Sequence, residues 1–433
     1  MNSKFSFLSL LLLVLISTQV SYANNSTEAL ARKAVSENAA EALPAIEDLR
    51  ALGPAGLQAL MDQYRIEISR RVADPSVASD EQWQRIATAL DTVAQQKNSY
   101  VAGLYWHTDL ETAKKVSAAT NKPILSLRLL GKLTDEFSCA NSRFFRTVLY
   151  SNAEVSSYLR QHYVLHWQSV RPVPKVTIDY GDGRKLERTL TGNSIHYVLD
   201  SHGRPVDALA GLYGPRAFHR ALSIGAWVVQ QIAGKNDAQR DAILQGYYDD
   251  QRSRITREWI RAINETGGKV PEGFRVDPRG GAYGIAPLAM TKAATERPIL
   301  RATLDRAPEA LGQVTDEAAW KKIAQLPLHK GDASLDPRSI ALIKRQNSSL
   351  TNQEMARLLR KFQELIALDT VRNEYLMHSK LYTWLIKDPE RNDLEKLNEK
   401  VYASLFLTPN SDPWLGLFSA DVYTALDNGG LVK

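Results

Sequence analysis

The chain has 433 residues, of which 44% are hydrophobic and 24% are charged, the proportions of an ordinary globular protein. Its formal net charge is +6, and the basic residues are scattered among acidic ones, which argues against a nucleic-acid-binding surface. The single cysteine, Cys139, excludes an internal disulfide, so packed cores must supply the stability.

The N-terminal segment has the three zones of a cleavable secretory signal peptide. Lys4 supplies the positive charge, residues 5–16 form an apolar run interrupted by two serines, and residues 21–23 offer small side chains at the cleavage positions. The run is shorter than the roughly 20 apolar residues of a transmembrane helix, although an uncleaved anchor is the alternative. We expect residues 1–23 to be removed and the mature protein to be exported, periplasmic or secreted, without a membrane span.

Residues 24–105 are expected to form a helical N-terminal region. Residues 29–43 are rich in alanine, and residues 57–72 carry apolar side chains at helical spacing. Asp80 can cap a helix over residues 81–96. No chemistry is visible in this region, which we interpret as a packing or partner-facing segment.

From about residue 106 to residue 233 the pattern alternates between helix and strand. Two buried strands are expected at 124–130 and 163–170, and two hairpins at 176–190 and 195–210. Helices are expected at 109–119, 139–151, 152–162 and 214–233. The order predicts an α/β domain with a central mixed sheet and helices on its faces.

The C-terminal region, residues 234–433, is expected to be mainly helical. Its clearest linker is the glycine-containing stretch 275–287. Thr351 and Glu354 form a capping box that opens a helical pattern reaching residue 387, and a last helix is expected at 393–407. Four side chains stripe one face of this pattern, as a buried core face would: Tyr375, His378, Tyr382 and Trp384.

Several segments between residues 109 and 222 resemble the thioredoxin-like superfamily. Residues 121–125, Asn-Lys-Pro-Ile-Leu, are similar to the entry into the first core strand of exported thioredoxin-like domains. Residues 151–155 and the stretch 198–206 are similar to the family's following turn and late hairpin. Cys139-Ala140-Asn141-Ser142 stands at a helix start, where the family places its Cys-x-x-Cys. The resemblance implies a thioredoxin-like mixed sheet with flanking helices.

The resemblance makes Cys139 the candidate nucleophile and Ser142 its neighbour in place of the second cysteine. A thiol at a helix N-terminus faces unpaired N–H groups that favour the thiolate, which can then attack a disulfide. Arg143 is close enough in sequence to add to this effect, and Asp135 is close enough to oppose it. Because Ser142 cannot resolve a mixed disulfide, any exchange would need an external thiol.

Further residues are expected around the thiol. Asn141 and Arg143 share its turn, and the loop before the strand at Ile195 faces the cysteine in the family, which brings in Ser194 and His196. The family has a cis-proline in that loop. This chain has Asn193-Ser194 there, so a trans peptide is expected, because a non-proline cis bond costs roughly 2.5–4 kcal/mol.

Two functional hypotheses follow. The first is a monothiol thioredoxin-like protein that exchanges with thiols or disulfides of envelope proteins through Cys139. The second is a non-catalytic thioredoxin-fold scaffold that binds an envelope protein through its helical flanks, with Cys139 as a small buried side chain. No cofactor or metal is expected, because His162 and His166 lack a third ligand and His166 falls in a predicted strand.

Overall fold

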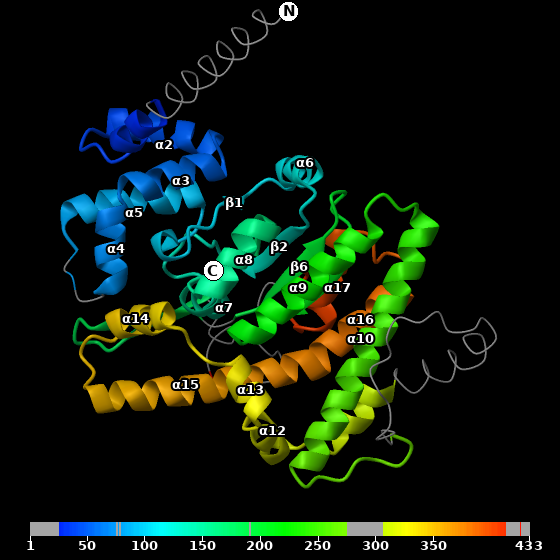
Figure 1. The fold of residues 1–433 in the computed structure, drawn as a ribbon. Helices are drawn as coiled ribbons and strands as arrows, with labels where there is room; N and C mark the ends of the chain where they lie inside the picture. Colours follow the sequence, from blue (N-terminus) through cyan, green and yellow to red (C-terminus); the bar gives the residue numbers. More distant parts are fainter. Residues whose placement is uncertain are drawn as a thin grey trace, which may run out of the picture.

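The structure is a computed structural model that describes residues 26–74, 77, 79–189, 192–274, 306–412 and 425. The expected signal peptide and the linker at 275–287 lie outside these ranges. Figure 1 shows three groups of elements in chain order: N-terminal helices, a sheet with its helices, and a C-terminal set of helices.

The N-terminal helices pack around a core of their own. Residues 26–33 are helical. Asp80 caps the helix that follows it by accepting the N–H of Trp83 at 2.7 Å, as expected. The helix expected over 29–43 is wrong in its bounds, because the chain turns at 34–38 and Asn38 caps a new helix. The elements are α2 (Ala39–Ala51), α3 (Pro54–Gln63), α4 (Arg65–Ala73), α5 (Glu81–Ala94) and the short 3-10 helix η1 (Ser99–Val101).

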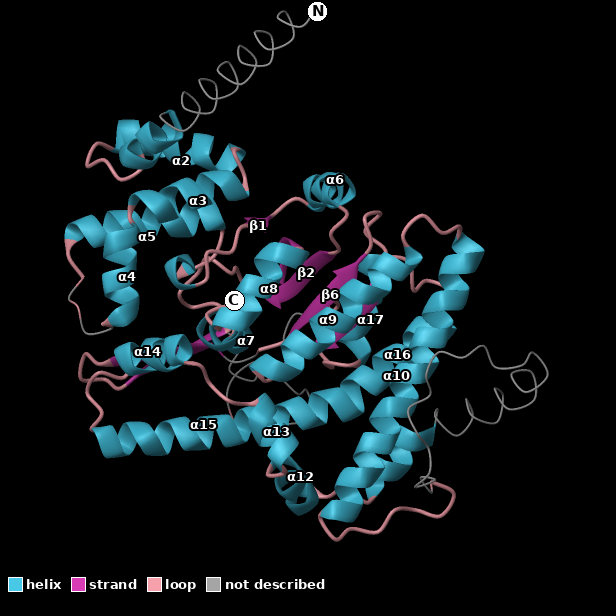
Figure 2. Cartoon of the chain, viewed as in Figure 1, coloured by secondary structure: helices cyan, strands magenta, loops and turns pink. Residues whose placement is uncertain are grey.

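A five-stranded mixed sheet lies at the centre of the molecule (Figure 2). Its strand order is β1-β3-β2-β6-β7, with β1, β3 and β2 parallel and with β6 and β7 antiparallel to their neighbours. Every residue of this interior strand β2 is buried, including Ser126 and Arg128. The strands are β1 (Trp106–His107), β2 (Ile124–Leu130), β3 (Val164–Arg171), β6 (Ser194–Leu199) and β7 (Pro205–Ala210).

The helices of this α/β part begin at capping residues. Asp109 caps α6 (Leu110–Thr120) and Asn152 caps α8 (Ala153–His162), each accepting a backbone N–H two or three positions into the helix. The helix expected over 139–151 is a short α-helix, α7 (Ala140–Phe144), that continues as a π-helix, η2 (Phe145–Leu149). The last helix of this part is α9 (Pro215–Ile232), and β4 (Lys175–Asp179) with β5 (Lys185–Thr189) forms the expected separate hairpin.

The C-terminal region is mainly helical in its described residues. Thr351 forms the expected capping box with Glu354. It begins three consecutive helical segments, which run along the lower part of the molecule in Figure 1. The middle segment is a π-helix, which the sequence did not predict. The elements are α10 (Asp237–Glu265), a helix at 306–313, α12 (Glu317–Ala324), α13 (Pro327–Asp332), α14 (Pro337–Gln346), α15 (Asn352–Arg372), η3 (Asn373–His378), α16 (Ser379–Lys387) and α17 (Leu394–Ser404).

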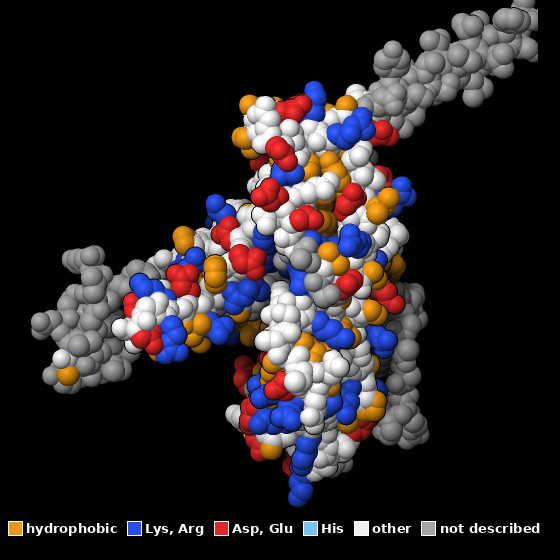
Figure 3. Space-filling model, turned by 90° about the vertical axis from the view of Figure 1, so that its left-hand side faces the viewer, with side chains coloured by type: hydrophobic (Ala, Val, Ile, Leu, Met, Phe, Trp, Pro, Cys, Tyr) orange, Lys and Arg blue, Asp and Glu red, His pale blue; other side chains and the backbone are white. Residues whose placement is uncertain are grey.

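Both edges of the central sheet are covered by helices. Arg50 of α2 donates to the carbonyl oxygen of Trp106 in β1 at 2.6 Å. Tyr248 of α10 donates to the carbonyl oxygen of Val206 in β7 at 2.9 Å. Covered edges are protected from pairing with another chain. On the face drawn in Figure 3, acidic and basic side chains are interspersed.

Among the helices of the described ranges, none combines the length and the apolar character needed to cross a membrane.

Candidate functional site

Cys139 is the N-cap residue of α7. Its backbone is outside the helical region, at φ −59° and ψ 158°, and its Sγ accepts a hydrogen bond from the N–H of Ser142 at 3.4 Å. Serine and threonine use the same geometry when they cap helices. The thiol therefore has a structural task in beginning this helix.

The Cys139 side chain is fully buried, with 0% of its surface exposed, and belongs to the main hydrophobic core. Burial raises the pKa of the thiol, because the charged thiolate is poorly solvated there. The backbone N–H of Ser142 acts in the opposite direction but does not reverse the shift. The thiol is thus held neutral, whereas the reactive cysteines of exchange enzymes have a lowered pKa.

Ser142 and Asn141 hold the turn in place. The Ser142 hydroxyl donates to the hydroxyl of Ser138, and Asn141 Nδ2 donates to Ser194 Oγ at 2.9 Å. The second contact joins the cysteine turn to the first residue of β6, which agrees with the expectation that the loop before β6 faces the thiol. The described residues contain no cis peptide, so the trans form predicted for the loop Asn193-Ser194-Ile195 is confirmed.

The two arginines that follow the thiol bind oxygen atoms. Arg143 Nη1 donates to the carbonyl oxygen of Ser138 at 2.7 Å and to Thr189 Oγ1, at the end of β5, at 3.1 Å. Arg146 Nη2 donates to Ser138 Oγ at 3.0 Å. Both guanidiniums therefore fasten the loop before α7 and its neighbours.

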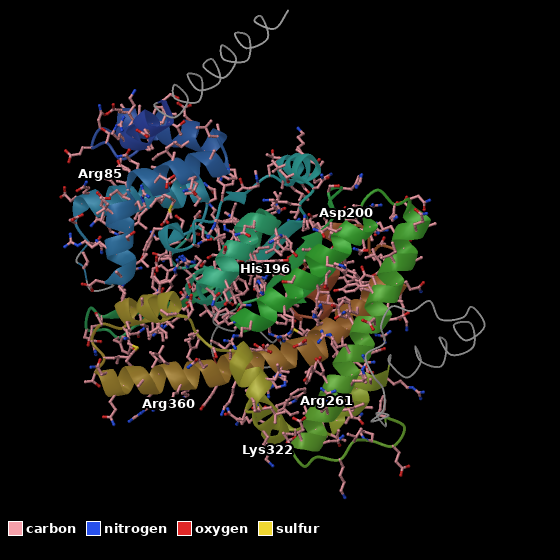
Figure 4. All side chains as sticks on the ribbon, in the orientation of Figure 1. Arg85, His196, Asp200, Arg261, Lys322 and Arg360 are labelled. Carbon is pink, nitrogen blue, oxygen red and sulfur yellow. The ribbon has the colours of Figure 1, made fainter. Side chains whose placement is uncertain are left out.

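His196 lies in an aromatic part of the core, near the centre of the molecule in Figure 4. Its Nε2 is 2.7 Å from the hydroxyl of Tyr150, and its ring packs between those of Phe145 and Phe218, at centroid distances of 4.6 and 4.9 Å. Burial lowers its pKa to about 3. These contacts describe a neutral core histidine.

Helix α17 and the residues after it cover the loop before β6. Tyr402 donates from its hydroxyl to the carbonyl oxygen of Asn193 at 3.1 Å, and Asn193 Nδ2 donates to Thr408 Oγ1 at 2.9 Å. The Tyr402 ring is fully buried, and this burial raises the pKa of its hydroxyl. The C-terminal region thus packs on the loop before β6, whose Ser194 bonds to Asn141 of the cysteine turn.

The paired histidines considered as metal ligands lie in different elements. His162 ends α8 and stacks on Tyr158 at 4.3 Å, whereas His166 is buried in β3 with Nδ1 2.9 Å from Ser126 Oγ. Burial lowers the pKa of His166 to about 3. Within the described ranges, no three acidic, histidine or cysteine side chains converge as metal ligands do.

A second group of polar side chains, which the sequence did not single out as a site, surrounds Asp207 of β7. The buried carboxylate accepts hydrogen bonds from the hydroxyls of Tyr247 and Tyr382 and from the N–H of Ala208 at 2.7 Å. His378 Nε2 lies 3.0 Å from its Oδ1. This carboxylate joins the α/β part to α10, η3 and α16.

An ionic cluster lies beside the group around Asp207. Arg254 of α10 donates to Glu258 at 2.8 Å and to Oε1 of Glu374 at 3.2 and 3.3 Å. Arg220 of α9 donates to both oxygens of Asp332 at 2.9 Å. Burial acts to raise the pKa of Glu374, but Arg254 and Arg220 outweigh it and lower the pKa, so the carboxylate is ionised.

The group around Asp207 lines one cavity with Tyr213 and with Arg220, Arg254 and Glu374 of the ionic cluster. The hydroxyl of Tyr213 is buried and has no hydrogen-bond partner among the described residues. The π-helix η3 contributes both Glu374 and His378, and π-helices are frequent at functional sites. The aromatic stripe was predicted to be core, and Tyr375 and Tyr382 are indeed buried, but His378 was not recognised as part of a polar cluster.

Comparison with protein-family models, with curated proteins and with solved structures finds no match to this chain. The function is therefore inferred from the geometry of the cysteine turn and of the cavity beside Asp207.

Proposed function

We propose that this protein is an exported, non-catalytic thioredoxin-like module that binds a protein partner of the cell envelope. The observation that carries the proposal is the complete burial of Cys139, with a thiol pKa raised by that burial. Of the two hypotheses drawn from the sequence, the geometry favours the one in which the thiol is structural.

The thioredoxin-like assignment is supported by where the cysteine turn lies. The sheet has three parallel strands followed by an antiparallel pair, and Cys139 comes between β2 and α7. The contact between Asn141 and Ser194 brings the loop before β6 to that turn, as the resemblance implies.

Thiol–disulfide exchange requires a thiolate that meets a disulfide of a second molecule. Three features of this chain work against that step. The thiol is neutral and buried, Ser142 stands where a resolving cysteine would be, and Tyr402 ties α17 to Asn193 in the loop before β6. A monothiol exchange through Cys139 would first need the packing around the thiol to open.

The covering of the sheet also indicates where a partner would bind. Helices cover both sheet edges, and α17 packs on the loop before β6, so a partner meets helices or the β4–β5 hairpin. Apolar side chains are exposed on the helical flanks, with Ile66 of α4 82% exposed and Leu365 of α15 50% exposed. We therefore assign partner binding to the helical flanks.

The test uses photocrosslinking amino acids at positions 66 and 365 in wild-type protein and in a Cys139→Ser variant, in intact cells. We expect both to give the same crosslinked partner with the same yield, and mature protein that begins at Asn24. A partner that is held through a reducible bond to Cys139, and is lost in Cys139→Ser, would support exchange chemistry and contradict the proposal. The same photocrosslinking amino acid at exposed Tyr180 of the hairpin is the matched surface control and should not give this crosslink.

A further inference from the structure

The β4–β5 hairpin stands apart from the central sheet. Its two strands pair with each other and form a sheet of their own. No residue of either strand is buried, whereas every residue of β2, β6 and β7 is. A two-stranded hairpin without further strands is at best marginally stable in water. A further strand along one of its edges would therefore stabilise it.

The outer edge of β4 has backbone groups without partners. In an antiparallel pair, opposite residues alternate between those that bond to each other and those whose backbone groups point outward. The N–H of Tyr180 donates to the carbonyl oxygen of Arg184 at 3.1 Å, which sets this alternation along the hairpin. Counting back from that pair, the outward groups belong to three alternate residues of β4: Lys175, Thr177 and Asp179. Within the described ranges, no hydrogen bond reaches these outward groups.

The order of side chains along β4 is complementary to itself. The strand reads Lys-Val-Thr-Ile-Asp from Lys175 to Asp179. When a second copy of β4 lies antiparallel to it about Thr177, Lys175 stands directly opposite the Asp179 of the second copy. Thr177 then stands opposite the Thr177 of the second copy. Opposite charges and threonine pairs at facing positions both stabilise a sheet, and the two-fold axis repeats each contact.

The charges on the hairpin leave Lys175 available for such a pair. Among the described residues its ammonium group contacts the ring face of Phe137, at 5.4 Å, and makes no salt bridge. Asp179 pairs with Lys185 of its own hairpin at 3.3 Å, and both side chains are more than half exposed. A lysine on an edge strand normally discourages pairing. Here the carboxylate of a second copy would face it, so the deterrent becomes a selective contact.

The apolar side chains of the hairpin agree with the same register. Val176 and Ile178 share one face of β4, and Leu186 lies directly opposite Ile178 on β5. Ile178 is 44% exposed, although isoleucine is usually buried. Pairing about Thr177 sets Val176 opposite the Ile178 of the second copy, so each side chain covers part of the other. The apolar faces of the two hairpins become continuous.

The edge of β5 does not complement itself in this way. Pairing β5 with its own copy about its central residue would place Glu187 directly opposite the Glu187 of the second copy, and like charges at facing positions are destabilising. It would also set the charged Arg188 against the apolar Leu186. The favourable edge is therefore that of β4.

We propose that a second copy of this chain pairs antiparallel with the edge of β4, centred on Thr177. The two hairpins then form one four-stranded sheet, in the order β5-β4-β4-β5, across a two-fold axis. Because each β4 edge is used once, the assembly closes as a dimer. This contact does not involve Cys139 or the helical flanks, so it goes beyond the proposed function and stands or falls separately from it.

Sedimentation equilibrium of the full mature protein over a concentration series tests the dimer. Thr177→Pro removes an N–H that points away from β5, and edge strands tolerate proline at such positions, so the hairpin should still form. We expect a monomer–dimer equilibrium in the wild type and a dissociation constant about tenfold higher or more in Thr177→Pro, because the central pair can no longer exchange its hydrogen bonds. Glu187→Pro, directly opposite Thr177, makes the matched change on the edge of β5 and should leave the dimer unchanged. A wild type that is monomeric throughout, equal effects of the two prolines, or assemblies that grow beyond the dimer would overturn the proposal.

The charges provide a second matched pair of variants. Lys175→Glu places two carboxylates opposite each other at both ends of the paired strands, so the dimer should weaken. Arg188→Glu makes the same change in net charge on the outer strand β5 and should leave the dimer intact. Equal weakening in both would show a response to net charge alone and would contradict the register.

A crosslink tests the register directly. Opposite residues that exchange both hydrogen bonds have Cα atoms about 5.5 Å apart, within the range of roughly 4.4–6.8 Å that a disulfide spans. In a Cys139→Ser background, mild oxidation of Thr177→Cys should therefore give a disulfide-linked dimer on a non-reducing gel. Glu187→Cys, on the outer strand, should give none. Absence of the dimer in Thr177→Cys, or an equal yield from both variants, would contradict the pairing about Thr177.

Discussion

The turn at Cys139 and the cavity at Tyr213 both contain buried polar groups, but they differ in whether the protein itself satisfies them. At the turn, the sulfur accepts the N–H of Ser142, and Asn141, Arg143 and Ser142 all have partners within the chain. At the cavity, the Tyr213 hydroxyl has no partner among the described residues, and space lies beside it. A cysteine, although typical of catalytic sites, is thus a weaker sign of a functional site here than a buried hydroxyl that lacks a hydrogen-bond partner and has space beside it.

The largest expected effect tests how strongly the cavity cluster holds the two parts of the molecule together. Asp207→Ala would leave the hydroxyls of Tyr247 and Tyr382 and the ring of His378 without their acceptor. Breaking a buried charged network of this kind costs about 3–5 kcal/mol in the free energy of unfolding. Urea denaturation measures it.

Asp237→Ala is the control for Asp207→Ala. Asp237 is an exposed carboxylate that pairs with Arg204, and exposed pairs contribute little. A loss in Asp207→Ala no greater than in Asp237→Ala would contradict the structural role of the cluster.

The core histidines predict a loss of stability in acid. The pKa values of His166 and His196 are lowered by burial to about 3, so between pH 6.5 and pH 3 the unfolded chain binds more protons than the folded protein. Stability therefore falls as the pH falls below 6.5, by about 2 kcal/mol for each histidine at pH 5. Denaturant unfolding at several pH values measures the slope.

A variant assigns part of that slope to one residue. His196→Gln should make the unfolding free energy less dependent on pH between 6.5 and 5, whereas the same change at exposed His202 should not. An unchanged slope in His196→Gln would show that this ring is already protonated or accessible in the folded protein.

The packing of α17 on the loop before β6 gives a kinetic prediction for the thiol. Tyr402→Ala removes a buried ring and its hydrogen bond to Asn193, which should let α17 open locally and speed alkylation of Cys139 at least tenfold, or about 1.4 kcal/mol in opening free energy. Tyr375→Ala removes an equally buried ring that stacks on Trp259, in the C-terminal helical cluster. Equal acceleration in both variants would mean that the thiol is reached by global unfolding.

The smallest expected effect concerns the capping role of the sulfur. Cys139→Ser keeps an acceptor at the N-cap of α7, whereas Cys139→Ala removes it, and the loss of a cap costs about 1 kcal/mol. Thermal unfolding should therefore place the serine variant above the alanine variant. The reverse order would show that apolar packing, and not capping, decides this position.

Much of the fold could be predicted because its signals are local. The apolar run over 124–130 has the bounds of β2, and Asp80, Asp109 and Asn152 each cap the helix that was expected after them. The β4–β5 hairpin also lies where its turn residues indicated. Such features depend on a few neighbouring residues, and the sequence displays them directly.

The features that were missed depend on partners far away in the chain. The strand β1 has only two residues and is defined by its pairing with β3, and the π-helices η2 and η3 interrupt patterns that look α-helical. Nothing in the sequence near Cys139 indicates that Tyr402 bonds to Asn193 in the loop before β6. The missing partner of Tyr213 likewise becomes visible only when α9, α10 and η3 are placed around it.

The pH dependence of Cys139 alkylation in the folded protein tests the central claim most directly. With a buried thiol whose pKa is raised, we expect no reaction under native conditions across pH 6 to 9, and full reaction once denaturant unfolds the chain. Rapid alkylation of the folded protein, with an apparent thiol pKa below the free value of about 8.5, would contradict the structural role of Cys139 and restore thiol exchange as the function.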